Sequence, residues 1–327
     1  MRQLTAAAEC FPIRGRFAIA RGARTESRVV TVTLTEGAAT GRGECVPYAR
    51  YGESLESVLS QIETVRDAVE QGGSWEALAG LLPAGAARNA LDCALWDLEA
   101  KQAGKRAWDL AGLPEPPVLT TAYTLSLDTP EAMGSAASAQ ADRPLLKIKL
   151  AGDARDRERV AAIRAAAPNA KLIVDANEGA SPETVEALCQ AMAELGVAMV
   201  EQPIPADQDD ALLGFAHPLP ICADEAFHTR RDLARIAERY DLVNIKLDKT
   251  GGLTEALAVL AEAEERGLGV MVGCMLGTSL AMAPAVLVAA RAQIVDLDGP
   301  LLLAADREPG LVYEGSRLHP PPAALWG

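Results

Sequence analysis

The feature that most constrains this chain is a succession of short apolar segments, separated by helical patterns, in its last two-thirds. Eight segments have this form: LTTAYTLSL, LLKIKL, KLIVDAN, AMVEQP, PICADEA, DLVNIKL, GVMVGCM and IVDLDGP. Near-continuous apolar strands that alternate with helices are typical of a parallel sheet covered on both faces. Eight such units in a row predict a closed α/β barrel of the (β/α)8 type. A doubly wound open sheet is the alternative, but no GxGxxG motif follows its first strand.

The residues before this series show a different pattern, with alternating strands followed by helices. RVVTVTLTEG, residues 28–37, alternates like a strand, and ATGRGECVPY reads as its hairpin partner. Helical patterns follow, one starting near Ser54 and one over residues 86–104, and GLPEPP at residues 112–117 reads as a linker. We therefore expect an α+β domain over residues 1–112, the barrel over 113–305, and a tail over 306–327 that folds back onto the first domain.

Charge and composition exclude several function classes. The net charge of -14 argues against binding to nucleic acid or to an anionic membrane surface. The uncharged run from Gly267 to Ala290 is long enough to span a bilayer, but it contains four glycines and a proline and is better read as a buried strand, a loop and a buried helix. Six scattered cysteines without a CxxC pair and the lack of a signal peptide favour a reducing, cytoplasmic location. A homo-oligomer is compatible with these features.

Three successive segments of the series each end in a carboxylate. Asp175 follows LIV, Glu201 follows AMV and Asp224 follows ICA. Because the carboxyl ends of barrel strands meet at one rim, these three acids should converge there. They would repel one another unless a cation lay between them, and an all-oxygen ligand set with room for water suits Mg²⁺. A helix N-cap is the ordinary explanation for one such acid, but it does not explain three at matched positions.

Lysines flank the three acids. Lys147 and Lys149 lie two apart in LLKIKL, so both side chains leave the same face of that strand. Lys246 ends a strand four further on, on the opposite side of a closed barrel. Burial and a like charge nearby would both lower the pKa of a lysine, which would make it usable as a base near neutral pH. Structural salt bridges are the alternative explanation.

A divalent cation between two opposed bases suits one reaction in particular. Removing the proton next to a carboxylate creates negative charge that a metal on the carboxylate oxygens can stabilise. With one base on each face, a proton that leaves one side can be replaced from the other, which inverts the carbon. This pattern is a known one for the enolase superfamily.

The motifs KIK, VDAN, VEQP, ADE and NIKLDKTGG, in this order and spacing, resemble the enolase superfamily of the muconate-lactonising type. The resemblance covers essentially the whole chain and implies a (β/α)7β modified TIM barrel with an α+β capping domain built from the N-terminal region and the C-terminal tail. It implies Mg²⁺ at the three acids, acid and base roles for Lys149 and Lys246, and a role for Lys147 in holding the substrate carboxylate and tuning Lys149.

Other stretches narrow the implied reaction. DLDGP places Asp296 and Asp298 on one face, and in the dipeptide epimerases of this superfamily such a pair grips the substrate ammonium. FAIARGARTES, GECVPYARYGES and LPAGAARNALDCALWDL resemble the bacterial L-Ala-D/L-Glu epimerases, and either Arg21 or Arg24 could pair with the distal carboxylate of a glutamyl side chain. The resemblance thus implies a dipeptide substrate, epimerised at its C-terminal residue, and a role in recycling murein peptides. Further rim residues expected to line the pocket are Thr124, Cys274 and Met275.

Two alternatives stay open at this point. The same fold and site residues serve other reactions, such as an o-succinylbenzoate synthase-type dehydration or racemisation of a different dipeptide. The Asp296 and Asp298 pair argues against the dehydration. A barrel that only binds a metal or a partner is the third reading, and the complete set of ligands and bases argues against it.

Overall fold

The computed structural model describes residues 1–327 and begins with a three-stranded antiparallel sheet. Its strands are β1 (Gln3–Ile19), β2 (Gly22–Glu36) and β3 (Ala39–Cys45), which pair in that order. The hairpin predicted from RVVTVTLTEG is confirmed as β2 and β3. Strand β1 was not predicted from the sequence, because its register with β2 shifts between Pro12 and Phe17.

Five helices follow this sheet: α1 (Leu55–Thr64), α2 (Arg66–Glu70), α3 (Trp75–Leu81), α4 (Ala86–Ala103) and α5 (Ala107–Leu110). Of these, α1, α2 and α4 pack against the sheet, and α3 and α5 pack against α4. A 3-10 turn, η1 (Ala49–Tyr51), precedes the five helices. The predicted helix over residues 86–104 is confirmed as α4, which ends at Gly104 in the left-handed conformation. It lies so close to β3 that a Cβ on Gly43 would come 2.1 Å from the carbonyl oxygen of Ala90. Glycine is therefore required at this contact.

The barrel consists of eight parallel strands, all at the positions predicted from the sequence. They are β5 (Tyr123–Leu125), β6 (Leu145–Lys149), β7 (Lys171–Asp175), β8 (Val197–Glu201), β9 (Ile221–Ala223), β10 (Leu242–Ile245), β11 (Gly269–Val272) and β12 (Ile294–Val295). A parallel bridge between Thr121 and Val295 joins the first strand to the last, so the sheet closes on itself. The prediction of a closed barrel is confirmed.

A layer of apolar side chains fills the bottom of the barrel, with one residue from each strand or its immediate start. The members are Ala122, Leu145, Ile173, Met199, Cys222, Leu242, Met271 and Ile294. Because side chains alternate along a strand, the residues two and four positions later point into the same interior. Lys147 and Lys149 follow Leu145 in this way, which explains why two lysines occur in a buried strand.

Helices follow the strands of the barrel: α6 (Pro130–Ser138), α7 (Asp156–Ala166), α8 (Val185–Glu194), α9 (Leu233–Ile236), α10 (Leu247–Thr250), α11 (Leu253–Glu265), α12 (Ser279–Ala289) and α13 (Gly299–Leu302), with the 3-10 segments η2 (Ala206–Leu212) and η3 (Arg230–Asp232). The short helices α10 and α13 contact the capping elements α4 and β1, respectively. The uncharged run from Gly267 to Ala290 forms β11, a loop and the fully buried helix α12, as predicted. None of the helices combines the length and the apolar character needed to cross a bilayer.

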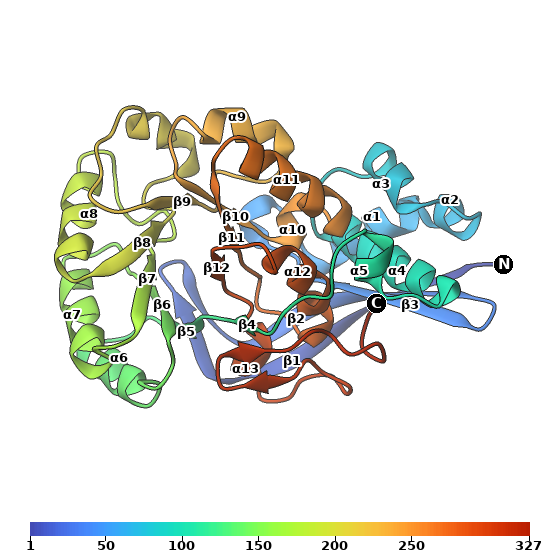
Figure 1. Cartoon of the computed structure of the whole chain (residues 1–327), viewed down its shortest axis with the longest axis horizontal. Helices are drawn as coiled ribbons and strands as arrows, with labels where there is room; N and C mark the ends of the chain where they lie inside the picture. The colour runs from blue at the N-terminus through green and yellow to red at the C-terminus, as the bar shows by residue number, and fades with distance from the viewer.

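The last residues return toward the N-terminal unit. Strands β13 (Tyr313–Glu314) and β14 (Arg317–Leu318) form a small sheet with β4 (Leu119–Thr120). Beyond them, Trp326 is fully buried and its indole Nε1 donates to the carbonyl oxygen of Cys93 in α4. In Figure 1 the red C-terminus accordingly ends beside the green helices α4 and α5. The division of the chain at residues 112 and 305 stays a prediction.

Candidate active site

Three buried acids meet above the apolar layer of the barrel. Asp175 ends β7, Glu201 ends β8 and Asp224 follows β9, each two positions after a residue of that layer. One carboxylate oxygen of each lies within 4.8 Å of those of the other two, and the acids are at most 2% exposed. Three hard oxygen donors this close together fit a divalent cation such as Mg²⁺.

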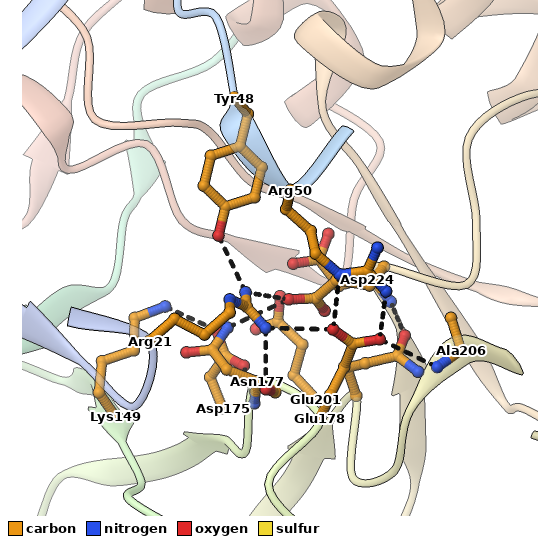
Figure 2. Close-up of polar contacts among 12 residues, drawn as sticks. Arg21, Tyr48, Arg50, Lys149, Asp175, Asn177, Glu178, Glu201, Ala206 and Asp224 are labelled. Carbon is orange, nitrogen blue, oxygen red and sulfur yellow. Dashed lines mark hydrogen bonds and ion pairs between the residues drawn. The ribbon is translucent and has the colours of Figure 1, made fainter. Parts of the chain in front are cut away.

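Two lysines lie at opposite edges of this group. Lys149 Nζ donates to Asp175 Oδ2 over 2.6 Å, and Lys246 Nζ donates to Asp224 Oδ2 over 2.6 Å. They come from β6 and from the residue after β10, and these strands are four apart in a closed barrel of eight. The two amines therefore approach the acids from opposite sides of the barrel mouth. Figure 2 shows Lys149 directed at Asp175, with Glu201 and Asp224 beyond.

Lys147 lies deeper and links the acids to the last strand. Its Nζ lies 2.6 Å from Glu201 Oε2 and 2.7 Å from Asp296 Oδ2, and the residue is 2% exposed. Burial by itself lowers the pKa of this ammonium. The negative charges of Asp296, Glu201 and Asp175 outweigh burial, so the pKa is raised well above its usual value.

The expectation of a depressed pKa is therefore wrong for Lys147 and for Lys246 in the protein by itself. Burial likewise lowers the pKa of Lys246, but Asp224 and Glu201 outweigh it and raise the pKa well above its usual value. Within LLKIKL the only charged neighbour of Lys147 is Lys149. The charges that decide the pKa come instead from carboxylates on other strands. A divalent cation ligated by these acids would oppose this effect, because the carboxylate charge would then be shared with it.

Several residues that hold the acids in place were missed by sequence reasoning. Lys249, fully buried on α10, donates to both the carbonyl oxygen and the Oδ1 of Asp224 over 2.6 Å. Asn244 Nδ2 donates to Glu201 Oε1 over 2.7 Å. Gln202 Oε1 accepts the backbone N–H of Asp224 over 2.9 Å. For Asn244 the available signal was a polar residue inside an apolar strand, since a buried polar side chain requires a partner. Lys249 lies in the polar stretch LDKTGG and gave no such signal.

An acidic pair lies at the end of the last strand. Asp296 Oδ2 pairs with Lys147, while its buried Oδ1 has no hydrogen-bond partner. Asp298 Oδ2 accepts the backbone N–H of Thr124 over 2.6 Å. Burial, and next the charge of Asp296, raise the pKa of Asp298 to about 7. The structure thus leaves acceptor capacity for a cationic group between these acids, and Cys274 and Met275 line the same cavity.

The capping sheet closes this cavity from above, and here the two candidate arginines differ. Arg21, in the turn between β1 and β2, donates to the carbonyl oxygen of Asn177 over 2.9 Å and to Tyr48 Oη over 2.9 Å, and it pairs with Glu178 (Figure 2). It also pairs with Glu225.

Arg24 lines the cavity as well, but it makes no ion pair and no side-chain hydrogen bond within the chain. Of the two arginines, Arg24 alone is therefore free to meet a ligand's carboxylate.

Family models match both parts of the chain. Residues 1–112 match the N-terminal domain model of mandelate racemase and muconate lactonizing enzyme, and residues 132–323 match the enolase C-terminal domain-like model. The chain is 51% identical to the L-Ala-D/L-Glu epimerase of Escherichia coli K12, over 98% of this chain and 100% of the relative. It is 44% identical to an N-acetyl-D-glutamate racemase of a Pseudoalteromonas species, over 91% of this chain and 95% of the relative.

A solved structure is similar over its entire length. It is an enolase family member from Agrobacterium tumefaciens with homology to dipeptide epimerases, described with bound sodium, L-Ala-L-Glu and an ordered loop. The TM-score is 0.97 at 55% identity, and each chain covers 100% of the other.

Proposed function

Because this chain belongs to the mandelate racemase and muconate lactonizing enzyme family of the enolase superfamily and is a dipeptide epimerase, we propose that its substrate pair is L-Ala-D-Glu and L-Ala-L-Glu. The enzyme is an isomerase, and the carbon that it inverts is the α-carbon of the C-terminal residue. That carbon is the one next to a free carboxylate, which is where the acids and lysines of the site can act.

One observation carries the proposal. The three acids lie between Lys149 and Lys246, whose strands stand opposite each other in the closed barrel. A proton removed by one lysine can therefore be replaced from the other face by the second, which inverts the carbon. Mg²⁺ held by Asp175, Glu201 and Asp224 would bind the substrate carboxylate and stabilise the negative charge that develops on it.

The remaining residues would orient the dipeptide. Asp298, with the free oxygen of Asp296, would hold the ammonium of the N-terminal residue, because a buried acidic pair favours a cation and repels an anion. Arg24 would pair with the distal carboxylate of the glutamyl side chain, for which a guanidinium is well shaped. Thr124, Cys274 and Met275 would line the space between these two ends.

A second candidate is racemisation of an N-acyl glutamate, which the identity to the N-acetyl-D-glutamate racemase favours. An N-acyl group carries no positive charge, so the acidic pair would gain nothing from it. The same pair argues against a dehydration of the o-succinylbenzoate synthase type, whose substrate has no ammonium.

Since L-Ala-D-Glu is a murein peptide, the proposed substrate implies that the enzyme takes part in the recycling of murein peptides. We also propose a cytoplasmic location, which is supported by six free cysteines, four of them buried.

The test is to incubate L-Ala-D-Glu, L-Ala-L-Glu and other L-Ala-L-Xaa dipeptides with Mg²⁺ in heavy water and follow the α-proton by NMR. We expect loss of the C-terminal α-proton signal together with appearance of the other diastereomer, fastest for the glutamyl dipeptides. Exchange confined to N-acetyl-glutamate, or no exchange in any dipeptide, would contradict the proposal.

A further inference from the structure

Two segments of the capping unit rest on the barrel through the same acid. Arg21, in the β1–β2 turn, and Arg50, in η1, both pair with Glu178, which lies three residues after the end of β7. Arg50 approaches in a fork, with Nε 3.0 Å from Oε2 and Nη2 2.9 Å from Oε1. Arg21 Nη1 lies 3.2 Å from Oε2 (Figure 2). One carboxylate thus joins two segments that are nearly 30 residues apart in the chain.

The backbone holds Glu178 in this position. Glu178 and the preceding Asn177 have φ values of 69° and 46°, in the left-handed region that non-glycine residues seldom adopt. Such backbone persists only where its surroundings enforce it. The N–H of Glu178 donates to the carbonyl oxygen of Gln202 over 2.9 Å, and its Oε1 accepts the N–H of Ala206 over 3.0 Å. The carboxylate is therefore fixed before either arginine reaches it.

The two arginines depend on this acid to different degrees. Glu178 is the only acid that Arg50 contacts. Arg21 has a second acidic partner in Glu225, which is 1% exposed at its side chain and directly follows Asp224. Burial raises the pKa of Glu178, but the hydrogen bonds from Arg50 and Ala206 outweigh it and lower the pKa, so the carboxylate is charged at neutral pH.

These contacts are separate from the chemistry. Glu178 contacts none of the three acids and none of the lysines that lie among them. Yet both segments that it holds border the cavity, through Arg21 and Tyr48. Arg24, proposed to meet the substrate, lies three residues from Arg21, so the position of the β1–β2 turn also sets the position of Arg24.

We propose that Glu178 is a positioning residue that fastens both capping segments over the cavity as one lid, and thereby keeps Arg24 in place for the substrate. The activity readout of this inference rests on the proposed function, whereas its proteolysis readout does not. The lid carries several arginines, so its opening can be followed by trypsin, which cleaves after Arg21, Arg24 and Arg50 when these segments leave the barrel.

The test compares Glu178→Gln with Glu183→Gln. The first change keeps an acceptor for Ala206 and removes the charge that the arginines use. The second removes a charge from the same loop, where Glu183 contacts Ser181 and no arginine. We expect Glu178→Gln to speed tryptic cleavage of the two segments and to raise KM for L-Ala-D-Glu, each by about 3- to 30-fold, with a smaller change in kcat. Glu183→Gln should match the wild type.

Arg50→Met separates a shared anchor from a general loss of structure. In an otherwise wild-type chain, Arg50→Met should speed cleavage after Arg24, which is the site that all of these variants retain and the one to be compared between them. In the Glu178→Gln background it should add nothing, because Arg50 has lost its only acidic partner, whereas Arg21→Met should still add an effect through Glu225. Since Arg50 lies at the surface, this variant also serves if Glu178→Gln fails to fold.

The inference is overturned if Glu178→Gln and Arg50→Met both leave cleavage rates and KM at the wild-type values, or if their effects simply add. If the wild type does not epimerise L-Ala-D-Glu, the proposed substrate fails. The cleavage experiment then still decides whether Glu178 holds the lid.

Discussion

Replacing Asp298 by asparagine tests how the enzyme recognises the ammonium of its substrate. Asp298 is 3% exposed, and asparagine has the same shape and keeps an oxygen to accept the N–H of Thr124. The substitution therefore removes a buried charge with little change in packing. The second acid, Asp296, cannot fully replace it, because Lys147 lies 2.7 Å from one of its oxygens and neutralises much of its charge.

The expected loss follows from the burial of this contact. Truncating one partner of a buried, hydrogen-bonded charge pair costs about 2–5 kcal/mol. Because the charge of Asp296 remains nearby, we take a value of about 3 kcal/mol, which corresponds to a fall of roughly 100-fold in kcat/KM for L-Ala-D-Glu. N-acetyl-glutamate has no ammonium, so its turnover or binding should not fall in the variant.

The pKa of the Asp298 carboxyl also predicts how kcat/KM for dipeptides depends on pH. The pKa of Asp298 in the free protein is about 7, and protonation removes the charge that attracts the ammonium. The kcat/KM for dipeptides should therefore fall as the pH decreases through about 7, and this step should be missing in Asp298→Asn.

The assay is NMR detection of epimerisation for the dipeptide, and titration calorimetry for Mg²⁺ and for N-acetyl-glutamate. Equal losses for the dipeptide and the N-acetyl compound would refute the assignment of an ammonium site. A matching loss of Mg²⁺ affinity would mean that Asp298 acts on the metal site.

Three further predictions follow from the geometry. Glu201→Gln should lower Mg²⁺ affinity at least 10-fold in calorimetry without unfolding the chain, since it removes one of three charged ligands; unchanged affinity would contradict the metal site. Arg24→Met should raise KM for L-Ala-D-Glu by about 10-fold but leave dipeptides with an apolar C-terminal residue unaffected, whereas loss on all dipeptides alike would count against a side-chain contact. Burial raises the pKa of the Asp248 carboxyl from 3.8 to about 7. The folded state therefore binds the carboxyl proton more tightly than the unfolded state does, and ionisation of Asp248 lowers the free energy of unfolding progressively from about pH 4 to pH 7. Asp248→Asn should therefore raise Tm at pH 8 and lose this advantage toward pH 4; a gain that does not depend on pH would refute the titration argument.

The barrel and the three acids could be predicted because the relevant signals are local and repeated. Each strand has an apolar residue that enters the interior layer, and a polar residue two positions later shares its direction, as Ile173 and Asp175 illustrate. Since the carboxyl ends of parallel strands meet at one rim, the order of the strands then fixes which polar residues come together. No knowledge of distant contacts is needed for this step.

Other features depend on contacts that the sequence does not contain. The pKa of Lys147 is set by acids 28, 54 and 149 residues away, which outweigh the effect of burial. The choice between Arg21 and Arg24 depends on how the β1–β2 turn meets Glu178 and Glu225 on the barrel. The strand β1 was missed because a register shift interrupts the alternation that identifies strands.

The measurement that tests the two-base arrangement most directly is α-proton exchange in heavy water with Lys149→Ala and Lys246→Ala, each supplied separately with L-Ala-D-Glu and L-Ala-L-Glu. If the two amines serve opposite faces of the α-carbon, neither variant should epimerise. Each variant should exchange the α-proton of at most one diastereomer, and the diastereomer should differ between the two variants. Full epimerisation by either variant, or exchange of the same diastereomer by both, would contradict the arrangement.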